Sequence, residues 1–388
     1  MLFLWYGFWY PFAVRILVDY RPALRERTGV GEYVHELARA LSTGPDSRDP
    51  ITLFSSSWKD RPSPDLAVEM PGVAIADAHV PVRALVWAWN RMEWPPVEWF
   101  AGEHDVVHSQ SPMLIPTTAA ARVVTIHDLD FLRHPDQMPA EIRRDYPRLA
   151  RSHAARADAI VVSSHYAAGE VTRELGVTPS RVHVCPPGRP HWSAAVAARQ
   201  AARRGTDILF MGTLNLRKNV GTLLEAYARL RAQVTDAPRL ILAGHATPAS
   251  ARWEARARQA PLAGHVEITG YVDPARKIEL FANARMLVLP SYEEGFGLPV
   301  LEAMACGVPV VVSSRGSLPE VAGGAADPID PDDADGMAER MRALLNDQQA
   351  ESAAQRGLLQ AAQYSWSACA AAARHAYESA MEVHAHRG

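Results

Sequence analysis

The sequence predicts an α/β protein with two doubly wound parallel sheets. Short apolar runs alternate with helical or irregular stretches, which is the rhythm of parallel strands covered by helices on both faces. The same unit of apolar run, polar loop and amphipathic helix opens both halves, at residues 14–42 and 207–230. Between them, residues 186–206 are rich in Pro, Ala and Arg, a shift typical of a crossing between domains.

Composition excludes several classes of protein. The 388 residues are 48% hydrophobic and 21% charged, as in an ordinary globular chain, and the formal net charge of −3 argues against a nucleic-acid binder. The three cysteines lie far apart and lack ligand spacing, so we read them as reduced thiols in a cytoplasmic protein. Because no His and Cys cluster occurs at ligand spacing, the sequence implies no metal ion.

The first 13 residues are unusually apolar and aromatic. Arg15 and Asp19 interrupt this run before it reaches the length of a membrane span, and it has neither the charged start nor the cleavage site of a signal peptide. We favour the interpretation that translation begins at Val14. An interfacial membrane anchor is the alternative.

The N-terminal half supplies one set of strands and an unusual aromatic segment. After the first strand, near residues 14–19, the expected strands are 51–54, 73–76, 105–108, 123–126, 159–162 and 182–185. Residues 84–100 hold four of the ten tryptophans. We expect these rings to pack together as a corner of the core, and the alternative is an apolar wall for an acceptor molecule.

A helix is predicted over residues 141–156, with five arginines. A solvated face is the ordinary explanation, and attraction to a membrane surface or to a diphosphate on an acceptor competes with it. Pro147 should kink this helix or move its start later.

In the C-terminal half, apolar runs at 239–243, 265–268, 286–289 and 308–312 predict the second sheet. The stretch 285–314 reads as strand, loop, helix and strand, which places the loop at the carboxyl edge, where ligands bind. Gly295 and Gly297 leave room for a ligand, Pro299 suits the first helical turn, and the amides at this helix start attract phosphate oxygens.

Charged residues surround this expected phosphate site. Glu294 and Glu302 repel phosphate but accept hydrogen bonds from sugar or ribose hydroxyls, so the arrangement suits a sugar nucleotide. Arg217 and Lys218, in the loop that opens the second half, would offset the charge of a diphosphate. An ordinary strand–turn–helix with solvated glutamates is the alternative.

Glu294 and Glu302, with seven residues between them and GFGLP inside, resemble the signature of the retaining glycosyltransferases of family 4. The segment LEAMACGVPVV supports this, and the resemblance extends over nearly the whole chain from residue 14, most strongly over 205–330. It implies the GT-B fold, in which two Rossmann-like domains face each other across a cleft. Residues 1–190 and a returning helix at 366–388 would form the acceptor-side domain, and residues 205–365 the donor-binding domain.

The resemblance also implies roles for individual residues. TGVGEYVHEL matches a glycine turn, Gly29 and Gly31, that approaches the donor phosphates, and TIHD places His127 near the transferred hexose. RKN matches a phosphate-binding pair in which Lys218 is the firmer member, because Thr213 stands after Gly212 where some members have arginine. The implied donor-binding set is Gly29, Gly31, Gly212, Arg217, Lys218, Tyr271, Val272, Gly295, Phe296, Gly297, Leu298 and Glu302, and the implied catalytic set is His127, Glu294 and Lys218.

The expected activity is transfer of a hexose, with retention, from a nucleoside diphosphate sugar to a hydroxyl acceptor. The best match is transfer of mannose from GDP-mannose to a glycan or lipid-linked glycan in cell-surface polysaccharide assembly, without a cofactor. The alternatives are a non-catalytic sugar-nucleotide-binding subunit and a sugar-nucleotide epimerase of the same fold. The expected location is the cytoplasm, with peripheral attachment to the inner face of the membrane left open. The acceptor and the oligomeric state are not predicted.

Overall fold

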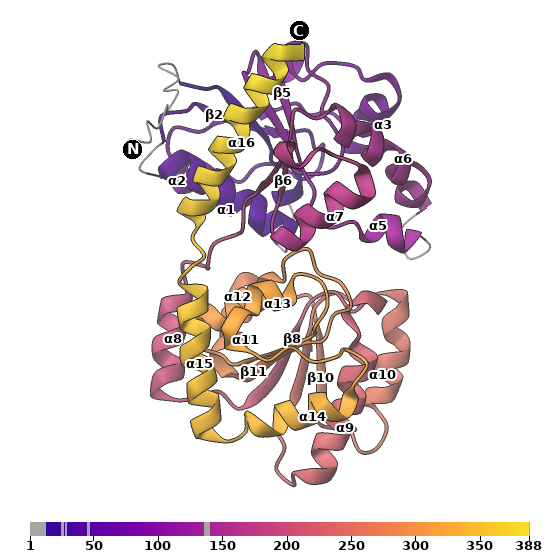
Figure 1. The fold of residues 1–388 in the computed structure, drawn as a ribbon, viewed down its shortest axis with the longest axis vertical. Coiled ribbons are helices and arrows are strands. Elements are labelled where there is room, and N and C mark those ends of the chain that lie inside the picture. Colours follow the sequence, from indigo (N-terminus) through magenta and orange to yellow (C-terminus); the bar gives the residue numbers. More distant parts are fainter. Residues whose placement is uncertain (1–12, 25–26, 28, 45–46, 136–139, 388) are drawn as a thin grey trace, which may run out of the picture. The chain divides into compact units, whose positions relative to one another are not determined.

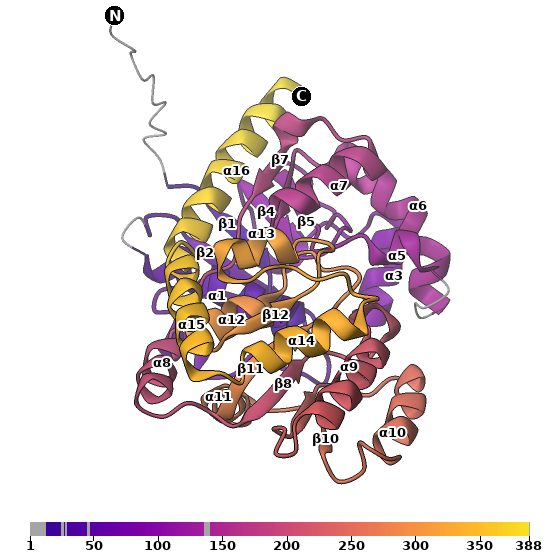
Figure 2. The ribbon, with the colours of Figure 1, turned by 60° about the horizontal axis from the view of Figure 1, so that its bottom comes forward.

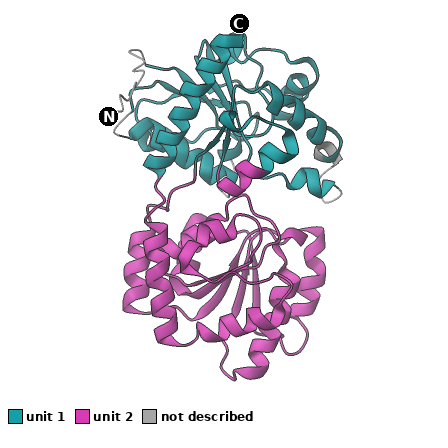
Figure 3. Cartoon of the chain, in the orientation of Figure 1, with its two compact units in different colours: residues 1–162, 170–185, 366–388 teal, residues 163–169, 186–365 magenta. Residues whose placement is uncertain are grey.

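The computed structural model describes residues 13–24, 27, 29–44, 47–135 and 140–387. The predicted choice between a start at Val14 and an interfacial anchor concerns the first 13 residues, and of these residues 1–12 lie outside the described part of the chain. The chain divides into two compact units (Figure 3). Unit 1 contains residues 1–162, 170–185 and 366–388, and unit 2 contains residues 163–169 and 186–365.

Unit 1 is built on a parallel sheet of seven strands in the order β3-β2-β1-β4-β5-β6-β7 (Figure 1). Its strands are β1 Ile16–Asp19, β2 Ile51–Ser55, β3 Ala74–Asp77, β4 Val106–Ser109, β5 Ala121–Thr125, β6 Ala159–Val162 and β7 Val182–Val184. Each apolar run predicted in this half is confirmed as a strand. The strand order reverses between β1 and β4, as it does in a doubly wound sheet.

Helices cover this sheet on both faces. They are α1 Val30–Thr43, α2 Leu66–Glu69, α3 Val82–Met92, α4 Glu98–Ala101, α5 Asp130–Arg133, α6 Ala140–Arg156, α7 His165–Leu175 and α16 Trp366–Arg387. The first five residues of α7 belong to unit 2. The last helix, α16, packs against α1 and against β5 and β6. Its Tyr377 hydroxyl lies 2.9 Å from Nδ1 of the buried His108, whose Nε2 lies 2.7 Å from Thr125 Oγ1. The first contact fastens the end of the chain to β4, and the second joins β4 to β5.

Two expectations for this unit need correction. Helix α6 contains Pro147 within its span, so the later start is wrong. The tryptophans of residues 84–100 do not form one core corner, because only Trp89 is buried. On α3, Leu85 and Trp89 are four residues apart and share the face that packs on the core, whereas Trp87, two residues from each, lies on the opposite face.

Unit 2 is built on a parallel sheet of five strands in the order β10-β9-β8-β11-β12. Its strands are β8 Asp207–Met211, β9 Leu240–Ala243, β10 Val266–Gly270, β11 Ala284–Leu289 and β12 Val310–Val312. Its main helices are α8 Ser193–Ala202, α9 Val220–Gln233, α10 Ala251–Ala257, α11 Pro274–Asn283, α12 Leu298–Ala305, α13 Leu318–Ala322, α14 Ala334–Ala343 and α15 Asp347–Ala361. The stretch 186–206, expected as a crossing, includes helix α8.

The strand order of unit 2 determines where its ligand site can form. From β8 the chain builds outward through β9 and β10, then returns to the other side of β8 to form β11 and β12 (Figure 2). The order therefore reverses between β8 and β11. The loops after these two strands diverge at the carboxyl edge, where doubly wound sheets bind ligands.

Candidate functional site

Lys218 and Glu294 come from the two loops that diverge at this reversal. Lys218 ends the short 3₁₀ helix Leu216–Lys218 after β8, and Glu294 lies between β11 and α12. The lysine Nζ is 2.5 Å from Glu294 Oε1, and the two residues are only 8% and 6% exposed. The structure thus brings together two predicted site residues that are 76 positions apart in the sequence.

Arg217 joins this pair. Its Nη1 donates to the Glu293 carbonyl oxygen at 3.1 Å and lies 3.9 Å from Glu294 Oε2. Burial raises the pKa of Glu294, but Lys218 and Arg217 lower it by more, so the net pKa is below its ordinary value. The carboxylate is therefore ionised at neutral pH beside two cations.

The loop that carries Glu294 is stabilised by contacts with residues that the sequence analysis missed. Ser317 donates to the Glu294 carbonyl oxygen through its amide at 3.1 Å and its hydroxyl at 2.9 Å. Gly316 lies so close that a Cβ there would be 2.7 Å from the Glu294 nitrogen. Gly295 and Phe296 are buried in the same loop, and the Phe296 ring packs edge-on against Tyr364. These contacts hold the backbone of the loop at Glu294 in place.

Helix α12 begins directly after the loop. Gly297 is its N-cap with φ of +93°, no side chain caps the first turn, and proline occupies that turn at Pro299 as predicted. A Cβ on Gly297 would lie 2.6 Å from Leu318 Cδ2. Leu298 is partly buried against the core. The first amides of this eight-residue helix have the polarity that an anion requires.

Glu302 lies one turn into α12 and is 4% exposed. Its carboxylate forms an ion pair with Lys277 of α11, a residue the sequence analysis did not identify. Burial raises the pKa of Glu302 and Lys277 opposes the shift, so the pKa remains above its ordinary value. The Lys277 Nζ also lies 5.8 Å from the centre of the Trp192 ring.

An aromatic stack lies at the ends of β9 and β10. Tyr271, which follows β10 and is 38% exposed, stacks on His245 with ring centres 5.0 Å apart and planes 22° apart. Val272 is partly buried against the core. His245 was also missed, although its place just after a buried strand could have indicated it. Gly212 directly follows β8, and a Cβ there would be 3.3 Å from Lys218 Cε.

In unit 1, His127 follows β5 and contacts α1. Its ring packs edge-on against Tyr33, with centres 5.2 Å apart. Within the described residues its buried Nε2 has no hydrogen-bond partner. Burial lowers the pKa of His127 to about 4, although Asp128 opposes the shift, so the ring is neutral at pH 7. Gly29 is the N-cap of α1 with φ of +48°, and Gly31 is buried in the first turn.

Two family models match this chain. The model described as "Glycosyltransferase Family 4" matches residues 27–192, and the model described as "Glycosyl transferases group 1" matches residues 197–358. The chain belongs to glycosyltransferase family 4. It is therefore a retaining glycosyltransferase that takes its sugar from a nucleotide sugar.

A curated relative agrees with this family, and solved structures show its fold. The glycosyltransferase is 29% identical to O-antigen chain mannosyltransferase B of Escherichia coli, covering 94% of this chain and 100% of the relative. Its fold matches sucrose-phosphate synthase from Thermosynechococcus elongatus with a TM-score of 0.72 and 20% identity, covering 94% and 98% of the two chains. It also matches Anabaena HepE in complex with UDP and glucose, with a TM-score of 0.66, 16% identity and coverage of 93% and 98%. The GT-B fold is thus confirmed.

The described part of the glycosyltransferase contains no group of three or more His, Cys, Asp or Glu that could hold a metal ion. Among the described helices, none combines the length and the apolar character that crossing a membrane requires.

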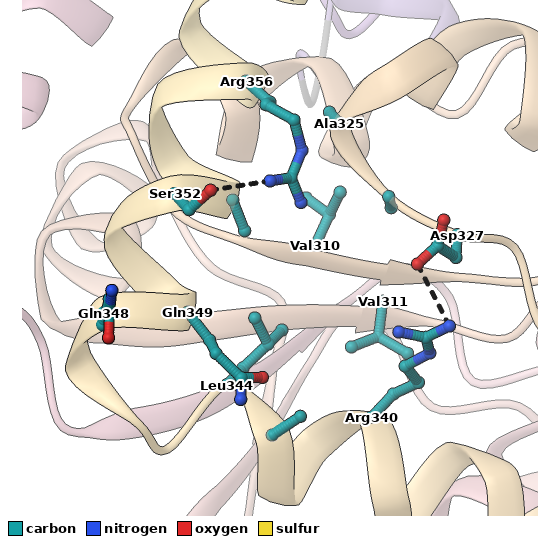
Figure 4. Close-up of a pocket in the computed structure, with 13 residues that line it drawn as sticks. Val310, Val311, Ala325, Asp327, Arg340, Leu344, Gln348, Gln349, Ser352 and Arg356 are labelled. Carbon is teal, nitrogen blue, oxygen red and sulfur yellow. Dashed lines mark hydrogen bonds and ion pairs between the residues drawn. The ribbon is translucent and has the colours of Figure 1, made fainter.

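A cavity of about 330 Å³ lies beside the edge strand β12, between the segment 325–327 and helices α14 and α15 (Figure 4). Arg340 pairs with Asp327 at 3.0 Å there, and Arg356 donates to Ser352 at 2.8 Å. None of the predicted donor-binding residues lines it. The cavity is therefore separate from the donor site that the sequence predicts.

Proposed function

We propose that this glycosyltransferase moves mannose from GDP-mannose to a hydroxyl of a glycan or lipid-linked glycan in cell-surface polysaccharide assembly. The observation that carries the donor site is the pairing of Lys218 with Glu294 where the strand order reverses. The choice of mannose is supported by the Escherichia coli relative, an O-antigen chain mannosyltransferase matched over its whole length.

The proposed chemistry follows from charge. As the glycosidic bond breaks, positive charge develops on the sugar and negative charge on the departing diphosphate. Lys218 and Arg217 would stabilise the diphosphate, together with the amides at Gly297 and Leu298. With Glu294 ionised, these three side chains carry a net charge of +1, which favours an incoming anion. Glu294 would then accept hydrogen bonds from hydroxyls of the sugar.

The remaining site residues receive roles at the two ends of the donor. We propose that Glu302 binds the ribose hydroxyls, that Tyr271 and Val272 hold the base, and that Gly295 and Phe296 shape the loop beside the sugar. Gly212 would let Lys218 lie against the backbone, consistent with its close approach to that side chain.

In unit 1, the proposed roles concern the sugar and the phosphates. Gly29 and Gly31 would approach the donor phosphates, and His127 would contact the hexose. A neutral imidazole suits the role of His127, because it can both donate to and accept from a hydroxyl. Residues 1–190 with 366–388 are proposed as the acceptor-side domain, and residues 205–365 as the donor-binding domain.

We further propose that the enzyme works in the cytoplasm at the inner face of the membrane. All three cysteines are free and buried, which suits a reducing compartment. A lipid-linked acceptor would require the enzyme to reach that membrane.

The test is a panel of nucleotide sugars, scored for protection against thermal unfolding and for slow hydrolysis without acceptor. GDP-mannose should raise the melting temperature most and release GDP. UDP-glucose is the essential comparison, because HepE was solved with UDP and glucose. Stronger protection and hydrolysis with UDP-glucose would replace the proposed donor, and Lys218→Ala should abolish hydrolysis of whichever donor binds.

A further inference from the structure

Four large apolar side chains are exposed on unit 1 within residues 87–99. They are Trp87 at 58%, Met92 at 53%, Trp94 at 50% and Trp99 at 66% exposure, and we call them the tryptophan surface. Trp94 and Trp99 contact each other edge-to-face, with ring centres 4.9 Å apart. Isolated exposed apolar residues are common, but three tryptophans within one short stretch point to a binding surface.

The helix beneath this surface is firmly attached to the core. Leu85 and Trp89 are buried at 2% and 3% exposure, and Trp89 Nε1 donates to the Pro95 carbonyl oxygen at 2.8 Å. Trp87 lies on the opposite side of α3, four residues from both Arg83 and Arg91, which are also exposed. The outer face of α3 therefore presents an indole ring between two guanidinium groups.

The neighbouring helix adds more positive charge. Figures 1 and 2 both show α3 and α6 side by side, and two ion pairs join this region, from Arg91 to Asp145 at 3.6 Å and from Glu93 to Arg156 at 2.7 Å. Together α3 and α6 contain seven arginines and two acidic residues. The exposed arginines of α6 are Arg143, Arg144, Arg148 and Arg151.

We propose that the tryptophan surface and the arginines of α3 and α6 bind the interface of an anionic lipid bilayer. Indole rings prefer the boundary between headgroups and acyl chains, and guanidinium groups pair with lipid phosphates. Neither feature suffices alone, because exposed arginines are usually only solvated and apolar side chains alone do not select a charged surface. Their juxtaposition selects a surface that is both apolar and anionic. The inference does not depend on which sugar is transferred.

The test uses the full chain in vesicle co-sedimentation. Vesicles of phosphatidylcholine alone are compared with vesicles of equal parts phosphatidylcholine and phosphatidylglycerol. The wild-type chain should bind only the anionic vesicles, and raising the salt concentration should weaken binding. Trp94→Ser with Trp99→Ser should weaken binding about tenfold or more, as should Arg143→Glu with Arg148→Glu. Leu359→Ser removes an apolar side chain from α15 of unit 2 that is 73% exposed, and vesicle binding should not change.

Hydrolysis of the donor sugar by the same variants shows that they are folded and separates this proposal from the donor assignment. The proposal is overturned if the wild-type chain does not bind anionic vesicles. It is also overturned if the double variants bind these vesicles as strongly as wild type does. It is also overturned if wild type self-associates in light scattering and the tryptophan variant is monomeric, since the surface would then join two copies.

Discussion

Lys218 and Glu294 form a buried ion pair, with 2.5 Å between the lysine Nζ and carboxylate Oε1, at the point where the strand order of unit 2 reverses. Each is the nearest opposite charge for the other, and Arg217 lies 3.9 Å from the second carboxylate oxygen. The lysine is thus held in place before any donor arrives. A positioned cation needs little reorganisation when a diphosphate departs.

Replacing Lys218 by Met should separate the structural from the chemical use of this lysine. Because a buried carboxylate would lose its main partner, we expect the free energy of unfolding to fall by about 3 kcal/mol and turnover to fall about 100-fold or more. Chemical denaturation and steady-state kinetics measure the two effects.

The double variant Lys218→Met with Glu294→Gln provides the control. Removing both charges should restore much of the lost stability, but not turnover, because the diphosphate would still lack its cation. Recovery of turnover in the double variant would contradict the proposed role of Lys218.

Donor affinity should depend on pH through Glu302. Its pKa lies above the ordinary value, so as pH falls through that pKa the carboxylate becomes protonated and loses its strength as an acceptor for ribose hydroxyls. Lys277→Met removes the cation that opposes this shift and should move the loss of affinity to higher pH. Calorimetric titration with GDP at several values between pH 5 and 8 measures the affinity of the wild-type and variant proteins.

Glu302→Gln is the matched control for this titration. The amide cannot titrate, so its affinity should be weaker than wild type and constant with pH. A wild-type affinity that also stays constant would remove Glu302 from the ribose site.

The sequence predicted the strands well because a strand buried on both faces is a continuous apolar run. The runs at 159–162 and 286–289, for example, became β6 and most of β11. Their carboxyl ends then indicated where ligands could bind. The pattern could not show that Lys277 pairs with Glu302 or that His245 stacks on Tyr271, because these contacts join separate loops and helices through space.

The prediction that the tryptophans pack together in the core failed for a different reason. Hydrophobicity predicts that a segment is apolar, but Trp87 and Trp89 differ only in the direction they take from α3. That direction depends on which face of the helix meets the core. On α3, Leu85 and Trp89 are four residues apart and mark the core face, whereas Trp87 lies four residues from the exposed Arg83 and Arg91. The expectation grouped the four tryptophans without placing them on a helix, so it did not use this period.

His108 should make stability depend on pH. Burial lowers its pKa to about 3, so between pH 6.5 and 5 the unfolded chain binds a proton at this histidine and the folded chain does not. The contribution of His108 to the free energy of unfolding is complete above about pH 6.5. As pH falls below this value, the contribution is lost at about 1.4 kcal/mol per pH unit. In the variant His108→Gln, the free energy of unfolding should fall less steeply with decreasing pH, because this histidine no longer titrates. Urea denaturation at pH 5–8 measures this dependence on pH. Equal slopes for the wild-type and variant proteins would contradict the prediction.

Gly297→Ala should disturb the start of α12 without adding charge or much volume. Its φ of +93° is unfavourable for alanine, and the new Cβ would lie 2.6 Å from Leu318 Cδ2. We expect a loss of about 2 kcal/mol in unfolding free energy and a clear loss of donor affinity, because the amides proposed to bind the diphosphate would shift.

Gly324→Ala is the control, since nothing lies within 4 Å of its new Cβ and no positive φ opposes it. It should change stability by less than about 0.5 kcal/mol and leave donor affinity intact. If Gly297→Ala binds GDP as tightly as Gly324→Ala does, the helix start is not where the diphosphate binds.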